Sequence, residues 1–310
     1  MSDRIVRALL KDANLLAVVC VATEVAREGR RRHGLAPSSA ALLGEALSAG
    51  LMVASLQKSE QTRINLQVEC DGPARGLFVD ADPEGRTRGY IRNKTVRFPP
   101  EPRFSTAPLL GKTGYVSVLR SVDGELYRGA VGIESGDLSR EIEGYFASSD
   151  QTDTTLQLEA LATGDEELGW VGGVLIQRLP DGDADVLAQL REKLRSGAVE
   201  AAVRSGLTTA HALLGEITGG LASDLLADQE VQYFCPCSRE RVFRALTVLP
   251  NIDLVEMITQ EHKALVDCEF CGAHYEVTEA ELREILDAVD RRDAAQEGGA
   301  DRERGGGTLN

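Results

Sequence analysis

Four cysteines near the C-terminus constrain this chain more than any other feature of its sequence. They form two close pairs, Cys235 with Cys237 and Cys268 with Cys271, separated by thirty residues. A tetrahedral zinc site needs four soft ligands at about 2.3 Å, and two short-range pairs joined by a small fold supply them. In an extended segment, residues two apart face the same side, so Cys235 and Cys237 can both reach one ion. The spacing therefore predicts that these four cysteines bind one Zn²⁺.

The same residues leave other interpretations open. An iron–sulfur centre uses four cysteine thiolates as well, and spacing does not exclude it. Four unrelated thiols, or buried cysteines that behave as small hydrophobic side chains, are a further alternative. His262 and His274 lie near enough in sequence to act as substitute ligands. Because four thiolates already complete the zinc shell, we expect both histidines to be surface or outer residues.

The segment 231–289 around these cysteines is too small to hold much core. A structural zinc contributes on the order of 10–16 kcal/mol of apparent folding energy, which matches or exceeds the roughly 5–15 kcal/mol stability of a typical domain. Loss of the metal is therefore expected to unfold the segment, and disulfides that close such tiny loops would not compensate. Oxidation of the thiolates thus becomes an unfolding signal. Arg239, Arg241 and Arg244 either favour the reactive thiolates or form a solvated helix face.

Residues 1–178 read as one α+β domain. Alternating apolar and polar residues bounded by turn signals predict strands over 17–22, 62–70, 77–80, 114–119, 125–131 and 171–178. Apolar residues at helical spacing predict helices over 38–57 and 138–148. Cys20 and Cys70 fall within predicted strands, apart from the cysteine pairs.

A helical linker over 179–230 is predicted to follow this domain. It begins at the boundary signal 180–183 (PDGD), and the pattern is helical from 184 to 228. Interior glycines interrupt it, and each costs a helix roughly 1 kcal/mol relative to alanine, so the segment should depend on packing against its neighbours. Either a hinge or a plain pair of surface helices accounts for this pattern.

Several short elements are expected around the cysteines in 231–289. Ser238 can cap a helix that ends before Pro250, and 253–260 forms another short helix. The second cysteine pair is expected in a hairpin, and Thr278 with Glu281 has capping-box spacing for a last helix to about Val289. Residues 290–310 are charged and rich in glycine, which predicts a disordered tail.

Composition excludes several function classes. The net charge of −15 opposes binding to phosphate backbones, so a zinc-ribbon nucleic-acid-binding regulator is the weaker alternative function. No apolar run approaches the ~20 residues of a membrane span, and the longest near the start, 15–22, lacks a signal-peptide ending, so we expect a cytoplasmic protein. An enzyme is also disfavoured. Gly111-Lys112-Thr113 resembles the end of a nucleotide-binding loop, but that motif needs a glycine five residues before Gly111, and position 106 is threonine. The chain also has only 4 histidines for acid–base chemistry.

The cysteine motifs resemble the 33-kDa heat-shock protein family of redox-regulated chaperones. Residues 234–242 (FCPCSRERV) and 267–275 (DCEFCGAHY) carry the most specific part of the resemblance. Further similar stretches are 42–45 (LLGE), 67–76 (QVECDGPARG), 127–129 (YRG), 131–132 (VG), 145–146 (YF) and 148–151 (SSDQ). Family members often carry a further cysteine after the arginine-rich motif, where this chain has Val242, but that position is not a ligand in the pattern.

The resemblance implies a holdase that works without ATP. In its reduced, inactive form, Cys235, Cys237, Cys268 and Cys271 would hold one zinc ion. Oxidants such as hypochlorite, or peroxide with heat, would form the disulfides Cys235–Cys237 and Cys268–Cys271 and release the zinc. The C-terminal unit and linker would then unfold, and the protein would form a homodimer and bind unfolding client proteins. Client binding is implied by the resemblance alone.

Overall fold

The structure is a computed structural model that describes residues 2–98, 104, 106–122, 124–163 and 167–304, with side chains described as far as Arg292. Residue contacts divide the chain into two compact units, Met1–Cys235 and Pro236–Asn310. Mixed sheets and helices confirm the predicted α+β class. The predicted boundaries of the core domain at 178, of the linker at 230 and of the zinc-binding domain at 289 stay predictions. The predicted linker, 179–230, lies in the first unit.

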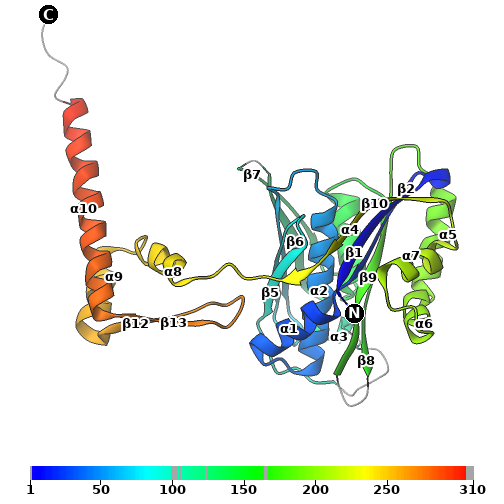
Figure 1. Ribbon diagram of the computed structural model, residues 1–310, viewed down its shortest axis with the longest axis horizontal. Coiled ribbons are helices and arrows are strands. Elements are labelled where there is room, and N and C mark those ends of the chain that lie inside the picture. The colour runs from blue at the N-terminus through cyan, green and yellow to red at the C-terminus, as the bar shows by residue number, and fades with distance from the viewer. Residues whose placement is uncertain (1, 99–103, 105, 123, 164–166, 305–310) are drawn as a thin grey trace, which may run out of the picture. The chain divides into compact units, whose positions relative to one another are not determined.

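Two sheets form the first unit (Figure 1). The five-stranded sheet has the order β10-β1-β2-β9-β8, and all of its neighbours are antiparallel. The six-stranded sheet has the order β11-β5-β4-β3-β6-β7, in which only β11 and β5 are parallel. The strands are β1 (Arg4–Leu10), β2 (Leu15–Val21), β3 (Arg63–Cys70), β4 (Leu77–Ala81), β5 (Arg86–Ile91), β6 (Gly114–Val122), β7 (Glu125–Gly132), β8 (Thr154–Thr163), β9 (Glu167–Arg178), β10 (Ser223–Glu230) and β11 (Gln232–Tyr233).

Helix α2 (Pro37–Ser55) is the centre of the main core and contacts strands of both sheets (Figure 1). It begins with a proline in its first turn, and alanine and leucine make up nine of its 19 residues. All of α2 except Ser55 is buried, so it has no solvated polar face, although Glu45 and three serines are among its buried residues. By length and composition alone α2 would suit a membrane span, although serines and Glu45 interrupt its apolar residues, so that no continuous apolar run approaches ~20 residues, as predicted. Within α2, 94% of the most apolar 18-residue stretch is buried inside the protein, so α2 is a core helix.

Three shorter helices complete this core. They are α1 (Thr23–His33), α3 (Ala107–Leu110) and α4 (Leu138–Ser148), and a single 3₁₀ turn, η1 (Lys11–Ala13), joins β1 to β2. Helix α4 has the predicted bounds, and Asp137 caps it by accepting a hydrogen bond from the Ser139 amide.

The predicted linker covers the opposite face of the five-stranded sheet. Along β2, Val18 and Cys20 belong to the core around α2, whereas Val19 and Val21 belong to a second core, because successive side chains of a strand face opposite sides. Helices α5 (Ala184–Arg195), α6 (Ala198–Arg204) and α7 (Ala210–Thr218) close this second core (Figure 1). Packing on the sheet, expected from the glycine content, therefore holds these helices in place.

The helical prediction for 184–228 is wrong at its end, because Ser223–Glu230 forms strand β10. This segment contains no β-branched residue, so its own preference for a strand is weak. Its conformation is imposed by antiparallel pairing with β1, from Arg4 opposite Glu230 to Leu10 opposite Ser223. Leu225 and Leu226 remain 56% and 50% exposed there.

The second unit is small. It contains α8 (Arg239–Leu246), α9 (Asn251–Glu256), the π-helical turn η2 (Met257–Glu261), the hairpin β12 (Lys263–Asp267) and β13 (His274–Thr278), and α10 (Glu279–Arg304). Nine of its described side chains form a buried core: Val242, Leu246, Leu254, Ile258, Ala264, Val277, Leu282, Ile285 and Val289. The predicted hairpin is confirmed, and α10 continues beyond the predicted end at Val289 to Arg304. Residues 305–310 of the predicted tail lie outside the described residues.

Both predicted caps of this unit are present. The Ser238 hydroxyl accepts a hydrogen bond from the Arg241 amide at the start of α8. Thr278 and Glu281 form a reciprocal capping box, in which the Glu281 carboxylate accepts from the Thr278 amide at 2.9 Å and the Glu281 amide donates to the Thr278 hydroxyl at 3.4 Å.

Candidate metal centre

The four predicted ligands lie together. The Sγ atoms of Cys235, Cys237, Cys268 and Cys271 are all within 4.8 Å of one another, and all four cysteines are free thiols. Around an ion with Zn–S bonds of about 2.3 Å, a regular tetrahedron places its sulfurs about 3.8 Å apart. The cluster therefore has the donor atoms and the size to hold one metal ion.

A tight turn between β12 and β13 positions the second cysteine pair. The Cys268 carbonyl accepts hydrogen bonds from the amides of Cys271, at 3.2 Å, and Gly272, at 2.8 Å, while the Cys268 amide donates to the Ala273 carbonyl. Gly272 has a φ of 68°, in the left-handed region that costs a residue with a side chain roughly 1–2 kcal/mol. The turn therefore brings both sulfurs to one side while the hairpin continues.

The first cysteine pair follows directly from a strand that is fixed to the six-stranded sheet. The Gln232 amide donates to the Gly85 carbonyl at 2.9 Å, and the Phe234 amide donates to the Thr87 carbonyl at 2.8 Å. The Tyr233 hydroxyl donates to the Gly89 carbonyl at 2.9 Å. These bonds set the direction in which the chain reaches Cys235, the last residue of the first unit.

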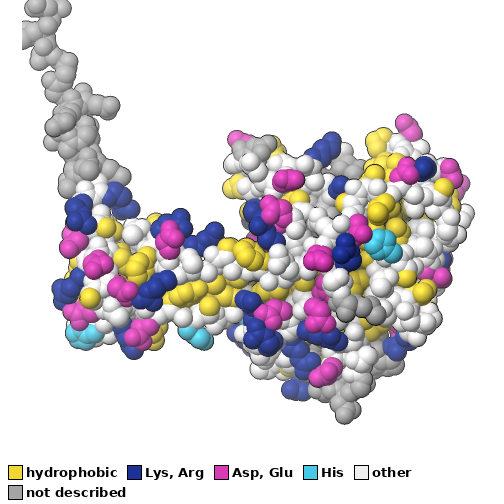
Figure 2. Space-filling view, viewed as in Figure 1, with side chains coloured by type: hydrophobic (Ala, Val, Ile, Leu, Met, Phe, Trp, Pro, Cys, Tyr) yellow, Lys and Arg dark blue, Asp and Glu magenta, His cyan; other side chains and the backbone are white. Residues whose placement is uncertain are grey.

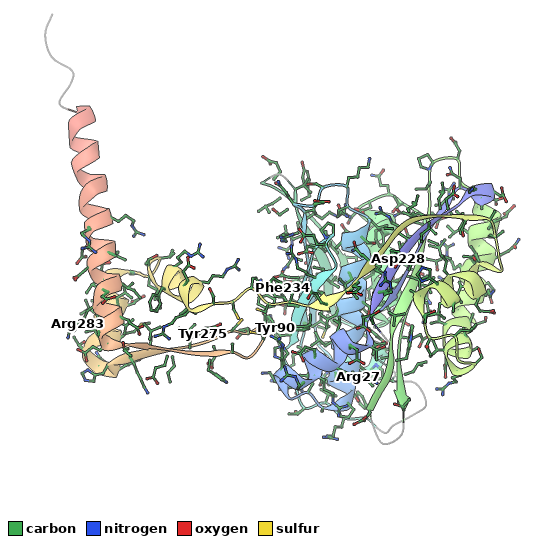
Figure 3. All side chains as sticks on the ribbon, viewed as in Figure 1. Arg27, Tyr90, Asp228, Phe234, Tyr275 and Arg283 are labelled. Atoms are coloured by element: carbon green, nitrogen blue, oxygen red, sulfur yellow. The ribbon has the colours of Figure 1, made fainter. Side chains whose placement is uncertain are left out.

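Side-chain hydrogen-bond donors of the described residues contact the sulfur atoms of Cys235 and Cys237. Within the first unit, the Arg88 Nη1 lies 3.4 Å from the Cys235 Sγ. Within the second unit, the Tyr275 hydroxyl donates to the Cys237 Sγ at 3.2 Å, and this bond raises the pKa of Tyr275 to about 12. Figure 3 labels Tyr275 on β13 and Phe234, which immediately precedes Cys235 in the sequence. Sequence reasoning did not assign a role to either donor, although Tyr275 is the last residue of the stretch 267–275 (DCEFCGAHY) that carries the family resemblance.

The two histidines near the cluster have other partners. The Nδ1 atom of His262 lies 3.0 Å from a carboxylate oxygen of Glu279, and that of His274 lies 2.5 Å from one of Asp267. Neither belongs to the group of described residues that could share one metal ion, which agrees with the expectation that they are surface or outer residues. In the nearby arginine-rich helix, Arg239 pairs with Glu281 and Arg244 with Glu240, which favours a solvated helix face.

The remaining cysteines are placed for packing. Cys20 is fully buried in β2, and desolvation raises the pKa of its thiol far above the ordinary value. Burial also raises the pKa of the Cys70 thiol at the end of β3. A thiol with a raised pKa carries little thiolate at neutral pH and reacts slowly with oxidants.

The sequence Gly111-Lys112-Thr113 does not form a phosphate-binding loop in this structure. The amides of Lys112 and Thr113 both donate to the Asp71 carboxylate, at 3.0 Å each. These two bonds lower the pKa of the Asp71 carboxyl. A phosphate would need the same amide groups, so their use by Asp71 argues against nucleotide binding here.

The surface of the first unit gives no support for nucleic-acid binding on the face in view. Basic and acidic side chains are interspersed there (Figure 2). In the arginine cluster of α1, Arg27 pairs with Glu24, and Arg31 and Arg32 both pair with Glu28. Phosphate binding favours a continuous basic area over such paired charges.

Comparison with known proteins decides the family. The sequence profile described as "Hsp33 protein" matches residues 3–278. This chain belongs to the Hsp33 family. Family membership identifies it as a chaperone rather than an enzyme, as predicted.

Relatives across bacteria resemble this Hsp33 chain over nearly its full length. The 33 kDa chaperonin of Geobacter sulfurreducens is 33% identical over 292 residues, covering 93% of this chain and 96% of the relative. That of Acaryochloris marina is 34% identical over 299 residues, covering 93% and 97%. The crystal structure of the 33 kDa chaperonin from Thermotoga maritima has a TM-score of 0.80 and 25% identity, covering 93% of this chain and 98% of the other.

Proposed function

We propose that this protein is a redox-regulated, ATP-independent holdase chaperone. The observation that carries the proposal is the cluster of four free thiols within 4.8 Å. Three of these cysteines belong to the second unit, in which nine of the described side chains form the buried core. A unit with so little core depends on additional links, which a metal bound to the four sulfurs supplies.

In the reduced state, Cys235, Cys237, Cys268 and Cys271 hold one Zn²⁺, and the protein is inactive. Four thiolates suit zinc in a closed structural site, where the ion supplies a cross-link between the two cysteine pairs. An iron–sulfur centre uses the same ligands, and a colourless purified protein would distinguish the zinc site from it.

Oxidation joins the cysteines within each pair, as Cys235–Cys237 and Cys268–Cys271. Formation of each disulfide releases two electrons, and one hypochlorite ion takes them up with two protons and becomes chloride and water. Both short-range pairs are thereby lost as metal ligands. Two disulfides that close such small loops restrain the chain only slightly, so the segment 231–289 unfolds.

Unfolding extends into the linker 179–230. The apolar surface that this exposes binds unfolding client proteins, and the active protein is a homodimer. The linker ends in β10, which already exposes Leu225 and Leu226, and only Val231 separates β10 from β11, which leads to Cys235. Its helices also carry apolar side chains that are buried against the five-stranded sheet and would become available: Leu187, Leu190, Leu194, Val199, Leu213 and Ile217. We place this activity in the cytoplasm, where thiols are kept reduced until stress.

The test follows zinc and chaperone activity together. Reduced and hypochlorite-treated protein is mixed with a heat-denaturing enzyme, light scattering reports aggregation, and a colorimetric chelator reports released zinc. We expect one zinc per reduced chain with poor suppression of aggregation, and zinc release with strong suppression after oxidation. A chain with all four cluster cysteines changed to serine, and Cys20 and Cys70 kept, is the matched control. Equal suppression by reduced and oxidised protein would reject the redox switch.

A further inference from the structure

Three neighbouring strands of the six-stranded sheet carry a row of polar side chains that leads to the metal centre. In the sheet register, Asn65 on β3 lies opposite Asp80 on β4, and Asp80 lies opposite Arg88 on β5. The Asn65 Nδ2 donates to the Asp80 Oδ1 at 2.6 Å. Directly opposite residues on one face of a sheet are close enough to form such side-chain pairs.

Asp80 fixes the orientation of the Arg88 guanidinium. The Arg88 Nε and Nη2 both donate to the Asp80 Oδ2, at 3.0 Å and 2.7 Å. The remaining terminal nitrogen, Nη1, then lies 3.4 Å from the Cys235 Sγ. The Arg88 side chain is only 22% exposed and that of Asp80 29%, so water competes weakly for these bonds. All of these residues belong to the first unit.

The main chain holds Cys235 within reach of this guanidinium. Strand β11 pairs in parallel with β5, with Tyr233 opposite Thr87, and the Phe234 amide donates to the Thr87 carbonyl. Cys235 therefore follows the last paired residue of β11 closely, beside the strand that carries Arg88. Backbone pairing and the side-chain contact thus act on the same cysteine.

We propose that Arg88 is a positioning residue of the metal centre that holds the Cys235 sulfur in place and slows oxidation of the cluster. This proposal rests on the proposed function only in taking the cluster to bind zinc. An N–H donor aimed at a thiolate stabilises its negative charge, and a cation does so more strongly than a neutral donor. The same bond withdraws electron density from the sulfur and makes it a weaker nucleophile toward an oxidant. Residues that orient metal ligands in this way typically change metal affinity about 10–100-fold when mutated.

The test compares Arg88→Gln with the parent in the full chain. Zinc affinity is measured by competition with a chelator, and the zinc-release rate is measured at a fixed low hypochlorite concentration. The Co²⁺-substituted protein provides a spectroscopic readout, because the sulfur-to-metal charge-transfer band reports electron density on the thiolates. We expect zinc affinity to fall about 10–100-fold, zinc release to accelerate, and the charge-transfer band to move to lower energy.

Three further variants separate positioning from charge and from folding. Arg92→Gln removes a cation near the end of β5 that pairs with Glu69, and it should leave all three readouts unchanged. Arg88→Lys keeps the charge but loses the planar fork, so it should recover less than half of the lost affinity. Asp80→Asn keeps Arg88 but weakens its orientation, and it should move each readout in the same direction by a smaller amount. Asp80→Asn also serves as the test if Arg88→Gln does not fold.

Two results would overturn the proposal. One is an Arg88→Gln protein with the parent's charge-transfer band and zinc-release rate, or the same outcome for Asp80→Asn if Arg88→Gln does not fold. The other is full recovery by Arg88→Lys, which would indicate a charge effect without positioning. Failure of the proposed function would look different, because the parent itself would then either bind no zinc or suppress aggregation equally before and after oxidation.

Discussion

Replacing Leu254 by alanine tests whether metal binding and folding of the second unit are one event. Leu254 on α9 has no exposed surface and lies in the nine-residue core of that unit. Truncating a buried leucine to alanine costs about 2–5 kcal/mol of folding free energy. If the metal-free unit is unfolded, each binding event must also fold the unit. The full cost of the truncation then appears in the metal affinity.

The expected loss of zinc affinity follows from this cost. A free-energy change of 2–5 kcal/mol corresponds to a decrease in affinity between about 30-fold and roughly 5,000-fold. Competition with chelators of graded strength measures the affinity, and circular dichroism of the metal-free protein reports whether the unit loses its helices. Leu254 is a member of the apolar core and is not among the described residues that could share the metal ion, so a change of this size would act through folding.

Leu213→Ala is the matched control, since Leu213 is equally buried but lies in the core beneath α5–α7 of the first unit. It should lower the stability of the first unit, which Trp170, the only tryptophan of the chain, reports by fluorescence. It should leave zinc affinity unchanged. A Leu254→Ala protein with the parent's zinc affinity would refute the reasoning, because the metal-free unit would then be folded already.

Further predictions concern backbone strain, pH and the remaining cysteines. Gly272→Ala places a side chain at a φ of 68° in the turn between Cys271 and β13, costs about 1–2 kcal/mol, and should weaken zinc affinity roughly 5- to 30-fold in the same competition assay. Burial raises the pKa of Asp3 from 3.8 to about 6, so the folded protein holds this proton more strongly than the unfolded chain, and this contribution to stability is complete below pH 3.8 and lost as the pH rises through about 6. Asp3→Asn should therefore gain roughly 2 kcal/mol relative to the parent between pH 4 and pH 7 in urea unfolding followed by Trp170, and a constant difference across this range would contradict it. Cys20→Ala should not change the hypochlorite concentration needed for zinc release, and alkylation of the native protein followed by mass spectrometry should leave Cys20 unmodified, because its thiol is fully buried.

The sequence was sufficient to predict features that form between residues close together in the chain. The spacing of Cys235, Cys237, Cys268 and Cys271 predicted a cluster that the folded chain does assemble, because each pair needs only a short extended segment or turn. The caps at Ser238 and Thr278 were predicted for the same reason, since a cap is a contact between residues three positions apart.

The tertiary structure decided what depends on partners distant in sequence. Strand β10 has a sequence with little strand preference, and only the edge of β1 makes it a strand. Helix α2 has the composition of a membrane span, and only the two sheets around it make it a core helix. Arg88 lies 147 positions from Cys235 and belongs to no motif, so the sheet alone brings its guanidinium to the sulfur. The sequence by itself thus determined which four residues could hold a metal ion, and long-range pairing decided which side chains surround them.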